Sequence, residues 1–125
     1  MKEFNRDNVG FGAIKGIPTI SLCKSGRIDL SQTAAAMLDM PRLGAKFYDD
    51  NEEMYIAPSN DSNAFRLRTK AKTGAMMQSS ALVRILLDKC GKNLNSATLE
   101  ISDKPHDGKY KINLVPLRFK KGAPA

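Results

Sequence analysis

Hydrophobic and polar positions alternate in two short segments near the beginning of the chain. Residues 17–23 and residues 27–30 place apolar side chains at roughly every second position, which is the period of a half-buried strand. Ser25 and Gly26 lie between the two segments, and both residue types favour a tight turn. The pattern therefore predicts a β-hairpin.

The segment after this hairpin changes to a helical pattern. Ser31 supplies the hydroxyl of an N-cap, and residues 32–39 are helix formers with apolar side chains on one side. Pro41 disfavours continuation of the helix. Two further strands are predicted at residues 45–48 and 53–57, because both segments are rich in apolar residues and an acidic turn separates them.

The second half of the chain repeats the order of strand, turn and helix. Residues 64–72 show the clearest alternation in the chain and predict a strand with Phe65 on its core-facing side. Gly74 favours the turn that follows. A pair of serines precedes a helix predicted over residues 81–90, and Gly91 is expected to end this helix in the left-handed conformation.

The last third of the chain predicts one more hairpin. Residues 97–101 and 109–115 are strand-like, and the turn residues between them indicate that the two strands pair with each other. Residues 117–125 are expected to form a disordered tail, and residues 1–16 a flexible N-terminal arm.

Two stretches of the sequence resemble each other, and their alignment matches glycine to glycine and serine to serine. The physical interpretation is two copies of one small unit, neither large enough to bury a core alone. The predicted fold is therefore α+β and β-rich. Two related β-β-α-β-β halves, residues 17–58 and 64–116, form a small barrel in a single domain over residues 17–116. The matched pairs are Lys24 with Lys72, Gly26 with Gly74, Ser31 with Ser79, and Leu38 with Leu86.

Composition adds the expectation of one soluble domain. The chain has 125 residues, of which 42% are hydrophobic and 26% charged, as in ordinary globular proteins. No apolar run approaches the length of a membrane span. The first residues lack the apolar core of a secretory signal. The expected location is the cytoplasm, without a membrane partner.

The formal net charge of +7 is distributed unevenly. Residues 1–63 carry seven Lys or Arg against nine Asp or Glu, whereas residues 64–125 carry thirteen against four. A cationic half attracts polyanions and accelerates their encounter with the protein. Nucleic acid is the commonest polyanion of the cytoplasm, although a basic protein can also be merely soluble.

The strongest functional pattern is a row of cations at every second position of the strand predicted over residues 64–72. One face of that strand would carry its cations about 6.6 Å apart, close to the spacing of phosphates along a nucleic-acid strand. The alternative is a solvated edge strand whose cations prevent aggregation. Similar pairs on later segments favour a binding surface. The row comprises Arg66, Arg68, Lys70 and Lys72, and the later pairs are Lys109 with Lys111 and Arg118 with Lys120.

The stretch from Gly26 to Leu30, the short helix after it and the acidic turn resemble the AbrB-type swapped-hairpin module of bacterial transition-state regulators and antitoxins. The matching positions are Gly26, Arg27, Ile28, Leu30, Leu38, Met40 and the tip Asp49–Glu53. Ser31 departs from the Pro of that family, and Asp39 from its Gly. The resemblance covers residues 19–57, and residues 67–115 only through the repeat.

This resemblance implies interleaved hairpins that form one barrel, with the second copy supplied by the same chain instead of a dimer partner. It also implies binding of duplex DNA through cationic side chains on the exposed face of the barrel. By position, it nominates Lys24 and Arg27 as DNA contacts.

No pattern for catalysis is convincing. His106 lies in a turn sequence, and the carboxylates at the acidic tip are expected to be a solvated turn instead of a metal site. Cys23 and Cys90 are expected to be buried free thiols. The aromatic residues, including Phe119, are expected to lie in the core. No cofactor, metal or enzymatic activity is predicted.

The sequence thus predicts a nucleic-acid-binding protein, with DNA expected over RNA, acting as a bacterial or phage regulator. Its basic strands would contact phosphates, and a homodimer is left open. The alternative is a structural or protein-interaction module of a phage or mobile element, whose basic faces meet an acidic partner. The predicted contacts are Lys24, Arg27, Arg66, Arg68, Lys70, Lys72, Lys109 and Lys111.

Overall fold

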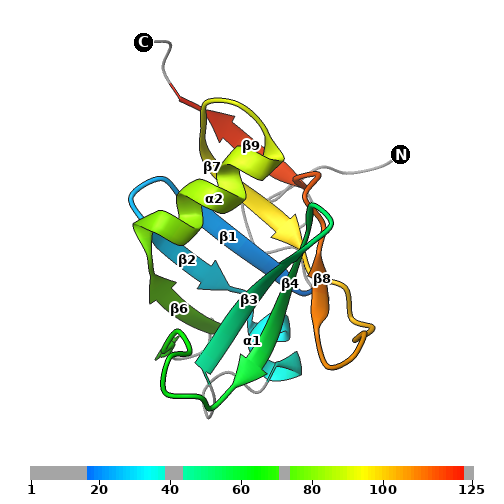
Figure 1. The fold of residues 1–125 in the computed structure, drawn as a ribbon. Coiled ribbons are helices and arrows are strands. Elements are labelled where there is room, and N and C mark those ends of the chain that lie inside the picture. Colours follow the sequence, from blue (N-terminus) through cyan, green and yellow to red (C-terminus); the bar gives the residue numbers. More distant parts are fainter. Residues whose placement is uncertain (1–16, 39–43, 71–73, 123–125) are drawn as a thin grey trace, which may run out of the picture.

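The computed structural model describes residues 17–38, 44–70 and 74–122. Within these ranges the chain forms a strand-rich α+β fold with two antiparallel sheets and two helices (Figure 1). In chain order the elements are β1 (Thr19–Cys23), β2 (Arg27–Leu30), α1 (Gln32–Met37), β3 (Gly44–Asp50), β4 (Glu53–Ser59), β5 (Arg68–Lys70), β6 (Gly74–Gln78), α2 (Ser80–Cys90), β7 (Leu94–Glu100), β8 (Tyr110–Ile112) and β9 (Arg118–Lys121).

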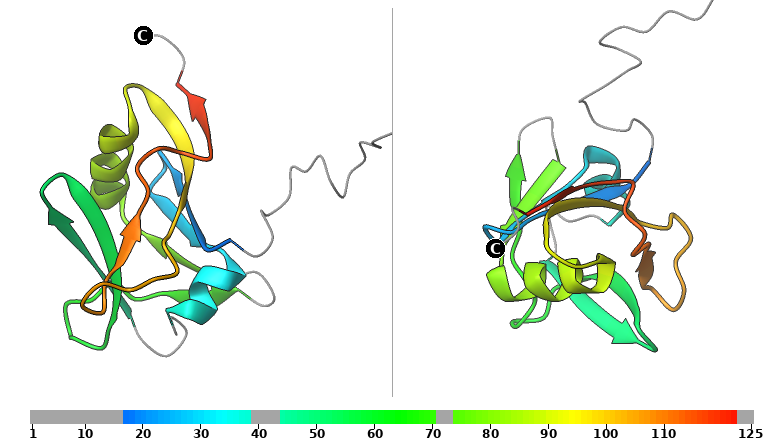
Figure 2. Two further views of the ribbon diagram at one scale, coloured as in Figure 1. Left: turned by 90° about the vertical axis from the view of Figure 1, so that its right-hand side faces the viewer. Right: turned by 90° about the horizontal axis from the view of Figure 1, so that it is seen from above.

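The larger sheet has six strands in the order β5-β6-β2-β1-β7-β9, and the smaller sheet has the order β3-β4-β8. Both α2 and the smaller sheet lie on the same side of the larger sheet, whereas α1 lies at one end of the molecule (Figure 2). No helix within the described ranges is long and apolar enough to cross a membrane.

The core lies between the larger sheet and the elements that cover it. Ile20 and Leu22 of β1 are buried there with Ile28 and Leu30 of β2, because alternate residues of each strand point to the covered face. Leu86 of α2 is fully buried in the same cluster. The polar residues between these positions are left for the opposite, outer face of the larger sheet.

Two isolated bridges connect the sheets. Ala45 of β3 pairs with Phe65, and Ile101, directly after β7, pairs with Ile112 of β8. The bridges lie at the two edges of the smaller sheet, since β3 and β8 are its outer strands. They join the sheets locally, and a closed barrel is not shown.

The two hairpin turns and the two helix starts agree with the sequence alignment. Gly26 and Gly74 have φ angles of 104° and 106°, a left-handed conformation that favours glycine. Ser31 and Ser79 cap α1 and α2, each accepting a hydrogen bond from the amide three residues later. The strand predicted over residues 27–30 has those bounds in the structure.

The pairing of β2 with β6 follows the same repeat. Arg27 lies opposite Gln78, and Leu30 lies opposite Ala75. Ala75 and Gln78 occupy the positions of the second copy that correspond to Arg27 and Leu30 of the first. The register is therefore unchanged when the two units are exchanged, as expected for two copies related by a local two-fold axis.

Two strand predictions need correction. Within the described part of the strand predicted over residues 64–72, only Arg68–Lys70 form a strand, β5, because Phe65 exchanges backbone hydrogen bonds with Ala45 of the smaller sheet. The predicted pairing of residues 97–101 with 109–115 is limited to one bridge. Instead β7 pairs with β1 and β9, and β8 pairs with β4.

Residues 118–121 of the predicted tail form β9, because they complete hydrogen bonds along the free side of β7. Gly91 is extended, with a φ of 162°, and it is Asn93 that takes a left-handed conformation. The predicted arm at residues 1–16, the helix end at Pro41 and the cation Lys72 lie outside the described residues.

Candidate nucleic-acid interface

The predicted row of cations is not carried by one strand. Arg68 and Lys70 are the first and last residues of β5 at the edge of the larger sheet, whereas Arg66 is exposed and precedes that strand. Lys72 lies outside the described residues. Because β6 separates β5 from β2, the remaining row does not continue directly into Arg27.

Two of the predicted cations interact with side chains of the smaller sheet. The Lys111 ammonium lies 3.1 Å from Glu53 Oε1, and the Tyr55 hydroxyl donates to Glu53 Oε2 at 2.8 Å. The Tyr55 hydroxyl and Lys111 lower the pKa of the Glu53 carboxyl. Lys109 lies over the ring of Tyr48, with its ammonium 4.5 Å from the ring centroid. These two lysines are therefore partly neutralised or held within the chain.

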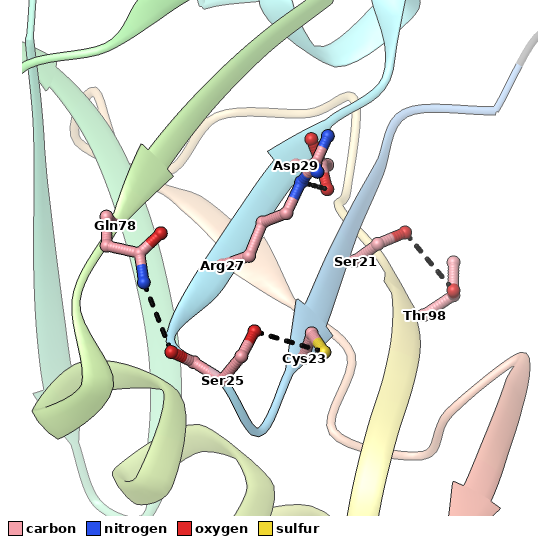
Figure 3. Close-up of polar contacts among 7 residues, drawn as sticks. All are labelled: Ser21, Cys23, Ser25, Arg27, Asp29, Gln78 and Thr98. Atoms are coloured by element: carbon pink, nitrogen blue, oxygen red, sulfur yellow. Dashed lines mark hydrogen bonds and ion pairs between the residues drawn. The ribbon is translucent and has the colours of Figure 1, made fainter.

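Arg27 belongs to a band of polar side chains across the outer face of the larger sheet (Figure 3). Its Nε lies 2.9 Å from Asp29 Oδ2, and its side chain is 45% exposed. Asp29 is opposite Ser21, which is opposite Thr98, and the last two hydroxyls lie 3.2 Å apart. Arg118 Nε lies 3.4 Å from the Thr98 hydroxyl. The positive charge of Arg27 thus comes with an adjacent negative charge.

The turn beside Arg27 contains the first cysteine. Cys23 is exposed, contrary to the sequence prediction, because its position in β1 alternates with the buried Leu22. The Ser25 hydroxyl, 3.4 Å from Cys23 Sγ, lowers the pKa of this thiol. Cys90 is half-buried, and burial raises its pKa to about 11. Both thiols are free.

A different group of cations gathers at one end of the larger sheet. Lys24 in the β1–β2 turn and Arg84 on α2 line the same hollow of about 310 Å³. Ser80 and Asn93 also line it, and Asp88 is the one acidic residue among the described residues of its lining. Apolar side chains of α2 and β7 complete the lining.

Backbone hydrogen bonds join the neighbouring segments to this hollow. The amide of Lys24 donates to the carbonyl of Asn95 at 2.8 Å, and the amide of Gly122 donates to the carbonyl of Asn93 at 2.6 Å. The β1–β2 turn, the α2–β7 connection and the end of β9 therefore lie side by side, at the upper left of Figure 1. We name the surface formed by their cations the basic end; its residues are Lys24, Arg84, Lys92, Lys120 and Lys121.

The cations of the basic end are not engaged in ion pairs within the described ranges, although Asp88 lines the same hollow as Lys24 and Arg84. None of its five cations forms an ion pair within the part of the chain that the structure describes. By contrast, Lys89, which is on the same helix as Arg84, forms an ion pair, with its ammonium 3.1 Å from Asp49 Oδ2. The basic end therefore concentrates positive charge on a surface that an anion can approach.

Sequence reasoning nominated only Lys24 of this surface as a contact. Arg84 and Lys92 are isolated in sequence, and neither belongs to an alternating pattern. Lys120 forms a cationic pair with Arg118 in the sequence, but the sequence predicts a tail for their segment. The contacts among four separate segments create the cluster, and no spacing within one segment could have indicated it.

His106 and the carboxylates of the acidic tip are the candidate side chains for catalysis or metal binding. His106 is in a turn with its side chain 84% exposed, 4.0 Å from Asp107. At the acidic tip, Asp49 and Glu53 form ion pairs with Lys89 and Lys111. The described residues hold no group of three His, Cys, Asp or Glu side chains placed to bind a metal ion.

The fold thus defines a strand-rich α+β domain with a basic end. Neither a protein-family model, a curated protein nor a solved structure matches the chain. The resemblance to the AbrB-type module consequently depends on the sequence positions alone.

Proposed function

We propose that the protein binds nucleic acid, DNA in the first place, through phosphate contacts at the basic end. The observation that carries this proposal is that five cations from four segments lie at one end of the larger sheet, with Arg84 on the side covered by α2 and Lys120 on the outer face. None of the five forms an ion pair among the described residues. Like charges held close together repel one another, and binding of a polyanion relieves that repulsion. A regulator of bacterial or phage genes is the role that fits such binding.

The remaining predicted contacts extend this surface. Arg27 follows the β1–β2 turn that carries Lys24, and its side chain is exposed on the outer face of the larger sheet. Arg68 and Lys70 belong to β5 at the opposite edge of that sheet, and Arg66 precedes this strand. Together with Lys72, which lies outside the described residues, they would form a second contact region. A ligand long enough to reach both regions, such as a duplex, suits this separation.

The AbrB-like barrel is part of the same proposal. The two bridges at the edges of the smaller sheet favour a barrel-like closure of the two sheets, and the symmetric pairing of β2 with β6 favours two copies of one unit in a single chain. In this interpretation the second unit takes the place of a dimer partner.

Fluorescence anisotropy with labelled duplex DNA, single-stranded DNA and RNA at several salt concentrations tests the function. The logarithm of the binding constant should fall with the logarithm of salt concentration, with a slope of about 0.9 per phosphate contact on duplex DNA. Absence of binding to all three ligands at low salt would refute the proposal.

A matched pair of charge reversals tests the surface. Arg84→Glu should weaken binding by about tenfold or more, because it places a negative charge at the hollow. Lys104→Glu makes the same change in net charge on an exposed residue of the β7–β8 connection, and it should have much less effect. Equal losses would mean that only net charge matters and that the basic end is not the binding surface.

The second candidate is a protein-interaction module with an acidic partner. Val115, Leu117 and Phe119 favour it, because all three are exposed beside the cations of β9.

A further inference from the structure

The edge strand β9 has one side without a partner strand among the described residues, and its segment carries exposed apolar side chains. An edge strand that binds nothing does not need this combination. Strand β9 pairs with β7 on one side, and no strand among the described residues pairs with its other side (Figure 1). All four residues of β9 are exposed. Lysines on such an edge prevent aggregation, but they do not account for the apolar residues on the same segment.

Apolar side chains occupy every second position of the segment that ends in β9. Val115, Leu117 and Phe119 are 74%, 41% and 52% exposed. Phe119 is opposite Ala97, which is 2% exposed and belongs to the core. Phe119 therefore lies on the core-facing side of the sheet, and yet half of its side chain is in solvent. The sheet extends at this edge beyond the elements that cover it.

In β9, the positions on either side of Phe119 carry cations, which lie on the outer face of the larger sheet. Arg118 is opposite Thr98, and Lys120 is opposite Ser96, two residues that alternate with the core positions of β7.

Lys121 is opposite the core residue Leu94 and therefore follows Phe119 on the core-facing side. Over residues 117–120 the segment thus presents an apolar side and a cationic side along one free edge, and Lys121 ends the apolar side with a cation. A strand added there would need apolar residues on one face and acidic residues on the other.

We propose that the free edge of β9 binds an extended peptide segment of a partner protein in which acidic and apolar residues alternate. Backbone hydrogen bonds to β9 would hold the peptide as a seventh strand of the larger sheet. Its acidic side chains would lie beside Arg118 and Lys120, and its apolar side chains would cover Leu117 and Phe119. A second copy of β9 is the wrong occupant, because it would place cations beside cations.

The probe is a fluorescein-labelled synthetic heptapeptide of alternating Glu and Val, titrated with the full chain and followed by anisotropy. Saturable binding is expected, together with slower amide hydrogen exchange at residues 118–121. A peptide of the same composition with Glu and Val in separate blocks should bind at least about tenfold more weakly, because it cannot match both faces. Equal affinity for both peptides, or no saturable binding, overturns the proposal.

Two exposed apolar residues provide a matched pair of variants. Phe119→Ser should weaken peptide binding by about tenfold, whereas Ile85→Ser, at a side chain of α2 that is 50% exposed, should leave it unchanged. Unchanged binding by Phe119→Ser refutes the proposal. Circular dichroism confirms that both variants are folded.

Reversing the charge of Lys120 tests the proposal even if the Phe119→Ser variant does not fold. Lys120→Glu should lose affinity for the Glu-Val peptide and gain affinity for the matching Lys-Val peptide. Failure of that exchange overturns the assignment to this edge. Lys120 also belongs to the basic end, so Lys120→Glu should weaken DNA binding as well. Phe119→Ser and Arg84→Glu separate the two activities, since Phe119→Ser should retain DNA binding and Arg84→Glu should retain peptide binding.

Discussion

The two hairpin–helix units, β1–β2–α1 and β5–β6–α2, have the same turns and helix caps but helices of different length. Gly26 and Gly74 have φ angles of 104° and 106°, and Ser31 and Ser79 cap the helices that follow. The helix of the first unit has 6 residues, whereas that of the second has 11. The two units share the interactions between residues that are close in sequence, and they differ in the length of the helix.

The longer helix creates the candidate interface. Ser79 donates its amide to the carbonyl of Gly26, so the turn of the first unit touches the start of α2. Because α2 continues beyond its first turn, Arg84 reaches the hollow that Lys24 also lines. The first helix ends at Met37 and carries no cation. The basic end therefore combines the turn of one unit with the helix of the other.

The glycine turns offer the largest test of this comparison. A Cβ at Gly74 would overlap the backbone carbonyl oxygen of Leu30, whereas a Cβ at Gly26 would lie 2.6 Å from the Ser80 hydroxyl, which can rotate. We expect Gly74→Ala to lower the free energy of unfolding by about 3 kcal/mol and Gly26→Ala by about 1–2 kcal/mol. Urea unfolding measures both. Equal losses would mean that the two turns have equivalent surroundings.

The serine caps offer a smaller test, in which the first unit should be the more sensitive one. Ser31 Oγ accepts hydrogen bonds from the amides of Ala34 and Thr19, whereas Ser79 Oγ accepts from the amide of Leu82. Ser31→Ala should cost about 1.5–2 kcal/mol and Ser79→Ala about 1 kcal/mol. Thermal melts of the two variants measure the difference. A larger loss for Ser79→Ala would show that the length of the helix outweighs the extra bond to Thr19.

The same contrast explains which parts of the fold could be predicted from the sequence. The turn at Gly26, the cap at Ser31 and the bounds of β2 depend on residues within one turn of chain, and the structure confirms them. The partner of β7 depends on which distant strand matches its core residues, and proximity in sequence wrongly favoured residues 109–115.

The candidate site was less predictable than the fold. Alternation over residues 64–72 gave a regular row of cations, but the exchange of hydrogen bonds between Phe65 and Ala45 shortens the strand that carries it. Arg84 and Lys24 are far apart in sequence and line the same hollow because the start of α2 lies against the β1–β2 turn. Phe119 is exposed because the elements that cover the larger sheet end before β9. This exposure depends on how all the elements pack together and not on the residues near Phe119 in sequence.

The smallest expected effect concerns the contact between the acidic first half of the chain and the basic second half. Glu53 of β4 interacts with Lys111 of β8, and its pKa lies below the ordinary 4.5 because the Tyr55 hydroxyl and Lys111 stabilise the charged form. A lowered pKa adds stability that is present above pH 4.5 and lost as the pH falls through the folded-state value. Since these groups are exposed, solvent screens the contribution.

Glu53→Gln should therefore make the acid side of the stability–pH curve slightly flatter, as measured by urea unfolding from neutral to acidic pH. Glu52 is an exposed neighbour without an ion pair in the described ranges, so Glu52→Gln should not flatten the curve. The same flattening in both variants would mean that net charge, and not the contact between Glu53 and Lys111, sets the acid sensitivity.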